Sequence, residues 1–147
     1  MLCYNGRSDR MYKFSELITF WESKNRNFYI SMDVKPTFPA WVFENIGGRS
    51  NYYDQFAESL SKLPTSPEST KKILLEFDSP RLLSQLKLYD TTKKMVRFYT
   101  GDGDTDEHIK IALANGYDGI SVEGVKSSAD AVKRARNAGL KDSYGHH

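Results

Sequence analysis

The sequence has few of the features that mark specialised classes of protein. It contains a single cysteine, Cys3, so no internal disulfide can form. Its formal net charge is only +2, so overall charge requires no polyanionic partner. No stretch approaches the roughly 18 apolar residues of a membrane helix, and no apolar signal segment is apparent. We therefore expect a cytosolic protein with no membrane partner.

Several common catalytic motifs are also missing. The chain has no phosphate-binding P-loop, no dinucleotide glycine fingerprint and no nucleophile elbow. The acidic segment 101–104, GDGD, lacks the glutamate that closes a calcium-binding helix–loop–helix site, so we expect a turn and helix cap there. His108 falls in the first turn of an expected helix and should face solvent. These absences argue against the usual hydrolase and metal-dependent sites, and we expect no bound metal.

What the chain does have is the composition of an ordinary globular domain. Its 147 residues suit one domain, which we place at 1–145. Charged residues make up 27% and hydrophobic residues 39%, both typical of a folded protein in water. Aromatic residues reach 13%. This excess fits a core rich in tyrosine and phenylalanine, or a cleft whose walls stack on flat ligands.

The spacing of apolar residues predicts a mixture of helices and strands. Helices are expected over 14–21, 38–46, 52–60, 105–115 and 127–138, and strands over 28–34, 72–78, 94–100 and 118–122. Asp104 and Glu107 form a capping-box pattern, and Gly116 suits the end of the same helix. Residues 81–88 fit a short helix or a strand, and 63–70 a polar loop. This order lacks the regular alternation of a doubly wound parallel sheet, which favours an α+β fold.

Three predicted strand edges carry polar groups: CYNGR at 3–7, FYISMD at 28–33 and GYDGISVEG at 116–124. In their order and spacing these segments resemble the ADP-ribosyltransferase superfamily over residues 2–124. Members of that superfamily cleave NAD at the bond between nicotinamide and ribose. The resemblance implies an α+β fold with a split, mixed or antiparallel sheet and packed helices.

The resemblance also implies a set of site residues. Glu123 would be the catalytic acid, because a carboxylate stabilises the oxocarbenium character that develops on the ribose. Ser31 would hold the nicotinamide ribose, and Tyr29 would stack on the nicotinamide ring. Asn5 and Arg7 would anchor NAD, with Arg7 pairing with the pyrophosphate. The implied cofactor is NAD, consumed as a substrate.

The chain departs from the superfamily pattern at two positions. Asn5 stands where His or Arg is usual. Ser121 lies two residues before Glu123, where the arginine-modifying transferases have Glu or Gln, which argues against arginine as the acceptor. A basic helix also follows the GYDGI segment in place of a further strand, so Glu76 is a second candidate for the catalytic carboxylate.

The leading hypothesis is NAD-dependent ADP-ribosyl transfer to a macromolecular acceptor, a protein in preference to a nucleic acid. Small stand-alone proteins of this kind are often toxins, effectors or phage factors. The alternative is a non-catalytic binding or inhibitor protein on the same scaffold, acting on a protein or nucleic acid through exposed aromatics or the basic segment 126–141. A third hypothesis is a small nuclease that uses the basic surface, although a histidine base is not evident.

Overall fold

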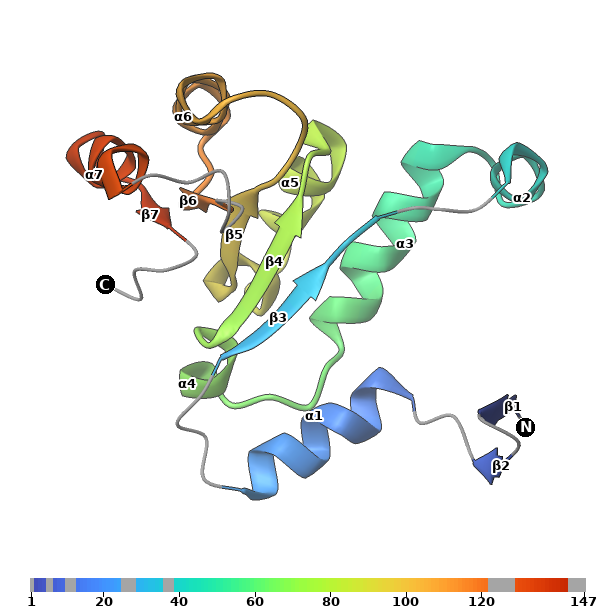
Figure 1. The fold of residues 1–147 in the computed structure, drawn as a ribbon. Coiled ribbons are helices and arrows are strands. Elements are labelled where there is room, and N and C mark those ends of the chain that lie inside the picture. Colours follow the sequence, from blue (N-terminus) through green and yellow to red (C-terminus); the bar gives the residue numbers. More distant parts are fainter. Residues whose placement is uncertain are drawn as a thin grey trace.

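The fold is taken from a computed structural model that describes residues 13–24, 29–35, 39–121 and 129–142, together with the backbone of residues 2–4 and 7–9. The first described strands, β1 (Leu2–Tyr4) and β2 (Arg7–Asp9), form an antiparallel two-stranded ribbon. Helix α1 (Phe14–Ser23) follows the ribbon and leads towards the main sheet (Figure 1).

The main sheet has five strands, and every neighbouring pair is parallel. Its order is the order of the chain: β3 (Ile30–Asp33), β4 (Ile73–Phe77), β5 (Val96–Tyr99), β6 (Gly119–Ile120) and β7 (Lys141–Asp142). The α+β class holds. The predicted split sheet of mixed or antiparallel strands is wrong.

The helices between the strands explain why the sheet is parallel. The chain passes from β3 to β4 through α2 (Ala40–Asn45), α3 (Arg49–Ser61) and α4 (Pro67–Thr70), and from β4 to β5 through α5 (Pro80–Leu86) and the 3-10 turn η1 (Thr92–Lys94). It passes from β5 to β6 through α6 (Thr105–Asn115), and α7 (Ala129–Asn137) lies between β6 and β7. A helix between two strands returns the chain to the end of the sheet at which the first strand began, so the next strand runs in the same direction. The sequence did not decide between helix and strand for 81–88 and did not indicate β7. The regular alternation of strands and helices was therefore not recognised.

The hydrophobic core lies on one face of the sheet. Its strand residues are Ile30, Met32, Ile73, Leu75, Phe77, Tyr99 and Ile120, which the strand register places on the same face. Against them pack Ile18 and Trp21 of α1, Ala57 and Leu60 of α3, three leucines of α5, Ala112 of α6 and Ala135 of α7. The described helices that contribute to this core therefore all cover one face, as expected when right-handed crossovers all step in the same direction.

The second face of the sheet is more polar near β3. Ser31 and Asp33 are exposed, and beside them in register lie Leu74 and Glu76 of β4, both half-buried. The predicted alternation of β3, with Ile30 and Met32 on one side and Ser31 and Asp33 on the other, is confirmed.

The capping signals predicted for α6 are confirmed at both of its ends. Asp104 accepts a hydrogen bond from the Glu107 amide at 2.9 Å and Glu107 accepts one from the Asp104 amide, so the capping box is present. Gly116 ends α6 in the left-handed conformation, with φ 81°. Helix α3 begins at Arg49, three residues before the predicted start at 52. Asn51 lies in its first turn, and its side-chain amide donates to the carbonyl of Ile46.

Gly119 is required by the close packing at the β6–β7 edge. A Cβ at this position would lie 2.4 Å from the carbonyl oxygen of Lys141 and 2.6 Å from Cε1 of Phe98. Gly119 therefore lies in a strand, as predicted for 118–122, and its missing side chain allows β7 to approach.

Within the described part of the chain, no helix combines the length and the apolar character needed to cross a membrane.

Candidate functional site

A polar cleft lies where three strands of the sheet end. The carboxyl ends of β3, β4 and β5 share one edge because the strands are parallel, and ligands of open parallel sheets bind outside this edge. The cleft has a volume of about 380 Å³. It is lined by Val34 and Lys35 after β3, Arg49 and Tyr53 of α3, Phe77 and Asp78 at the end of β4, and Thr100, Gly101 and Asp102 after β5.

Three of the four charged side chains in the cleft have no ion-pair or hydrogen-bond partner among the described residues. Among the described residues, the carboxylates of Asp78 and Asp102 and the guanidinium of Arg49 make no hydrogen bond or ion pair. Lys35 forms an exposed ion pair with Asp33, with Nζ and Oδ2 2.9 Å apart. Arginines elsewhere are commonly paired, as Arg97 is with Asp118. Free charges of both signs in one cleft are typical of a binding site for a polar ligand.

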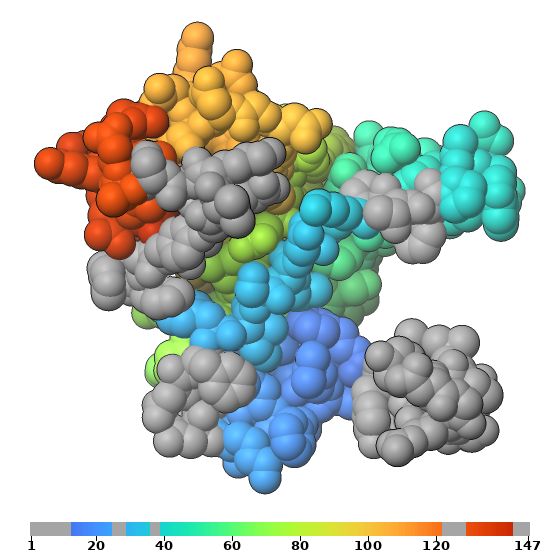
Figure 2. Space-filling model, in the orientation of Figure 1, coloured from blue at the N-terminus to red at the C-terminus, as the bar shows by residue number. Residues whose placement is uncertain are grey.

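Arg49 is held at the mouth of the cleft by an aromatic ring. It is the first residue of α3, after Gly48, whose φ of 100° suits glycine. Its guanidinium carbon lies 4.3 Å from the ring centroid of Phe43, a cation–π contact. Phe43 is itself buried on α2. In space-filling view α2 and the start of α3 lie on the side of the molecule away from α7 (Figure 2). The contact with Phe43 uses the face of the guanidinium, and its N–H groups bond to none of the described residues.

Buried tyrosines lie beneath the cleft. The Tyr117 ring centroid is 5.3 Å from that of Phe77 and 5.5 Å from that of Tyr99. Burial raises the pKa of both tyrosine hydroxyls above the usual 10.0, and the negative charge of Asp78 raises both further. The two phenols therefore stay protonated well above neutral pH.

The loop after β5 is fixed by its neighbours. Gly101 lies directly against Tyr99, because a Cβ at Gly101 would meet the Tyr99 hydroxyl at 2.6 Å. The Nε2 atom of His108 lies 3.3 Å from the backbone carbonyl of Asp102, and its ring contacts Tyr99 edge-on. The expected turn and helix cap at 101–104 is confirmed. In the described segments no three His, Cys, Asp or Glu side chains gather as metal ligands.

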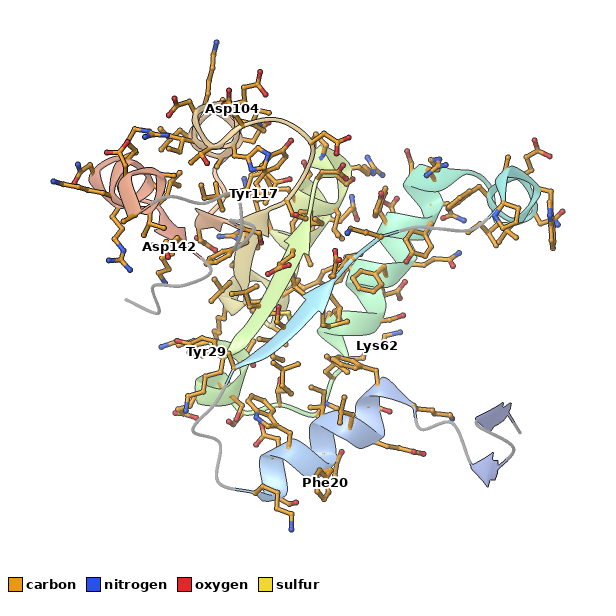
Figure 3. All side chains as sticks on the ribbon, viewed as in Figure 1. Phe20, Tyr29, Lys62, Asp104, Tyr117 and Asp142 are labelled. Atoms are coloured by element: carbon orange, nitrogen blue, oxygen red, sulfur yellow. The ribbon has the colours of Figure 1, made fainter. Side chains whose placement is uncertain are left out.

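The residues predicted from the sequence lie elsewhere or outside the described residues. Tyr29 lies at the amino end of β3, and Figure 3 shows it at the opposite end of the sheet from Asp104. Ser31 is exposed on the second face of the sheet, which it shares with Glu76. The structure therefore places Tyr29 and Ser31 outside the lining of the cleft.

The remaining predicted residues are not described. Asn5, Glu123 and the side chain of Arg7 lie outside the described residues, so the arrangement of the predicted NAD site stays a prediction. Ser121 ends the described chain after β6, where its amide donates to the Tyr99 carbonyl. Its hydroxyl is buried and has no hydrogen-bond partner in the described segments.

The basic helix α7 is largely neutralised by nearby acids. Arg134 pairs with Asp106 of α6 at 2.9 Å and with Asp130 of its own helix. Arg136 pairs with the buried Asp142 of β7, also at 2.9 Å. These contacts give both arginines a structural role within the fold, which weakens the hypothesis that this helix binds a polyanion.

Sequence reasoning missed the charged residues of the cleft, although a signal for them exists. Lys35, Asp78 and Asp102 each follow a β-rich run by one to three residues. Polar residues at this position converge only if the strands are parallel, and the sequence was interpreted as a mixed sheet. Arg49 carries no comparable signal.

No protein-family model and no curated protein matches this chain.

Proposed function

We propose that the protein binds a small polar molecule in the cleft at the carboxyl ends of β3, β4 and β5 and catalyses a proton-transfer reaction on it. The observation that carries this proposal is that one cleft gathers Asp78, Asp102 and Arg49, whose charged groups pair with none of the described residues. All three side chains are exposed, so they can reach a ligand, and they lie at the end of the sheet where ligands of open parallel sheets bind.

The two aspartates would perform the proton transfer. A carboxylate within hydrogen-bond reach of a ligand hydroxyl or an acidic C–H accepts its proton, and the resulting carboxylic acid returns a proton to the product. The negative charge of Asp78 also acts on the hydroxyls of Tyr99 and Tyr117, because it raises the pKa of both. We assign Asp78 the role of general base, because it lines the cleft directly after β4 and lies near the two tyrosines.

NAD-dependent ADP-ribosyl transfer stays a prediction based on sequence motifs. The parallel sheet differs from the split sheet that the resemblance implies, so the fold adds no support to it. A cleft of 380 Å³ corresponds to the volume of roughly a dozen water molecules at about 30 Å³ each, which suits a small metabolite better than a complete dinucleotide.

A thermal-shift screen tests the binding half of the proposal. The intact protein is screened against a panel of small polar metabolites, with NAD in the same plate. A ligand at 100 times its Kd should stabilise the fold by about 2.7 kcal/mol. Asp78→Asn should remove or weaken this stabilisation. Asp90→Asn is the matched control, because Asp90 lies before β5, at the other end of the sheet, and its one ion pair among the described residues is with exposed Lys93.

Turnover of the bound molecule, followed by NMR, tests the catalytic half. Loss of a general base should lower kcat by roughly 100- to 10,000-fold in Asp78→Asn, with no change in Asp90→Asn. If no metabolite stabilises the protein, or if both variants behave alike, the cleft is not a functional site. Stabilisation by NAD that is unaffected by Asp78→Asn would favour ADP-ribosyl transfer instead.

A further inference from the structure

The charges of the cleft are separated by sign along the edge of the sheet. The cations Lys35 and Arg49 lie after β3 and at the start of α3, and the acids Asp78 and Asp102 lie after β4 and β5. From this separation we infer that the ligand is a phosphorylated polyhydroxy compound of the size of a sugar monophosphate. The inference rests on the proposed function, since it names the molecule that the cleft binds.

Arg49 is the first argument for a bound phosphate. A cation in the first turn of a helix is disfavoured by the helix dipole, typically by 0.3–1 kcal/mol. The first turn of α3 has no acidic residue to offset this charge, and Arg49 has no ion-pair partner in the described part of the chain. The helix dipole therefore does not favour Arg49. The Phe43 ring holds its guanidinium at the cleft, where it can bind two phosphate oxygens of an anionic ligand at once.

Lys35 supplies the second positive charge. Its ion pair with Asp33 joins side chains that are 64% and 48% exposed, and exposed pairs contribute little free energy. The Asp33 contact is therefore a weak competitor for a stronger anion at Lys35. Two cations at one end of the cleft match the charge of a phosphate monoester, which is close to −2 at neutral pH.

The acidic end of the cleft defines the rest of the ligand. Asp78 and Asp102 are hydrogen-bond acceptors only, so they favour a partner with several donors, such as the hydroxyl groups of a sugar. The same carboxylates repel a second phosphate. This excludes a nucleic acid or another extended polyanion as the natural occupant, because its charges would extend over the acidic end.

The volume of the cleft agrees with this class. Space for roughly a dozen waters is enough for a sugar of three to six carbons with one phosphate. Inorganic phosphate alone would fill only the cationic end and leave both carboxylates without donors.

Isothermal titration calorimetry tests the inference with ribose 5-phosphate, glucose 6-phosphate and glycerol 3-phosphate. Ribose, glucose, glycerol and inorganic phosphate serve as matched ligands. We expect at least one sugar phosphate to bind about 10- to 100-fold more tightly than its unphosphorylated partner, because hydrogen bonds to a charged group are strong. We also expect it to bind more tightly than inorganic phosphate.

Arg49→Gln separates recognition of the phosphate from general effects on the cleft. In this variant the preference for the phosphorylated ligand should fall about tenfold, and affinity for the unphosphorylated partner should be unchanged. Arg49→Lys should recover only part of the preference, because lysine cannot make the two-pronged contact. Lys94→Gln, an exposed cation at the other end of the sheet, should leave both affinities unchanged.

The outcomes distinguish this inference from the proposed function. Equal affinity for phosphorylated and unphosphorylated ligands, or an unchanged preference in Arg49→Gln, overturns the inference and leaves the proposed function intact. The same holds if no sugar phosphate binds while the metabolite screen finds another ligand that depends on Asp78. If the screen finds no ligand at all, both fail.

Discussion

Tyr117 is a buried phenol whose surroundings favour its neutral form. Its ring packs against Phe77 and Tyr99, and burial, followed by the charge of Asp78, raises the pKa of its hydroxyl above 10.0. A group whose pKa is raised by folding contributes stability that is complete below its unfolded pKa. That contribution is lost as the pH rises from about 10 through the folded value.

The first prediction therefore concerns alkaline pH. Above pH 10 the wild-type free energy of unfolding should fall faster than that of Tyr117→Phe, by up to about 1.4 kcal/mol per pH unit. Phenylalanine keeps the ring packing but has no proton to lose. Urea unfolding at pH 7, 9, 10 and 11 measures the difference. If the free energies of unfolding of the two proteins fall in parallel above pH 10, the pKa of Tyr117 is not raised by folding.

Ser79 is a second residue whose role is local. Its hydroxyl caps α5 by accepting a hydrogen bond from the Leu82 amide at 3.1 Å, and the residue is only 8% exposed. Ser79→Ala should lower the free energy of unfolding by about 0.5–2 kcal/mol. Ser84→Ala, in the exposed part of the same helix, should change it by less than about 0.5 kcal/mol. Chemical denaturation of both variants checks the contrast, and equal values would show that the cap contributes nothing.

At the residue scale, the sequence predicts a role correctly when that role depends on residues close by in the chain. Asp104, Glu107 and Gly116 act on backbone groups within four residues, so their roles could be inferred correctly. Asp78 and Arg49 acquire their roles from segments 29 residues apart that meet only in the folded chain. No local pattern encodes that meeting.

At the scale of elements, α7 and β7 are joined by a partly buried ion pair. Arg136 donates to Asp142, whose side chain is only 1% exposed, while Arg134 pairs with two exposed acids. The two arginines are two residues apart on one helix, so they form a matched pair. Figure 3 labels Asp142 beside α7, at the edge of the sheet.

Arg136→Met should therefore destabilise the fold far more than Arg134→Met. Removing the Arg136 cation from the buried Asp142 should cost near the lower end of about 3–5 kcal/mol, because Arg136 itself is half exposed. Arg134→Met should cost less than about 1 kcal/mol. Denaturant midpoints measure both, and Asp142→Asn added to Arg136→Met should recover part of the loss. Equal costs for the two arginines would contradict a structural role for the buried pair.

Helices were easier to predict than strands at this scale. The apolar spacing of 14–21 and 105–115 repeats over two or more turns, and α1 and α6 are found there. Strand β7 has two residues, Lys141 and Asp142, and neither is apolar. Its pairing depends on the space left by Gly119 and on Arg136, so a pattern of hydrophobicity could not reveal it.

At the scale of the whole molecule, the sheet has a protected centre and an open edge at β3. Ile30 and Val34 donate their amides to β4 neighbours, so the alternate amides of Ser31 and Asp33 point to the outer edge. Within the described residues nothing pairs with that edge.

Amide hydrogen exchange should reflect this arrangement. The amides of β4, which lies between β3 and β5, should exchange slowest, near the rate set by global unfolding. Those of Ser31 and Asp33 should exchange orders of magnitude faster. Residue-resolved NMR measures both sets in one experiment. Slow exchange at Ser31 and Asp33 would show that the outer edge of β3 is paired in solution.

The order of the strands also has a consequence for protein synthesis. Each strand pairs with the strand translated just before it, so the sheet can grow from β3 as the polypeptide leaves the ribosome. All the residues that line the cleft lie between Val34 and Asp102. The charged lining of the cleft is therefore complete before α6, α7 and β7 have been translated, and these last elements then add Tyr117 beneath it and brace the sheet.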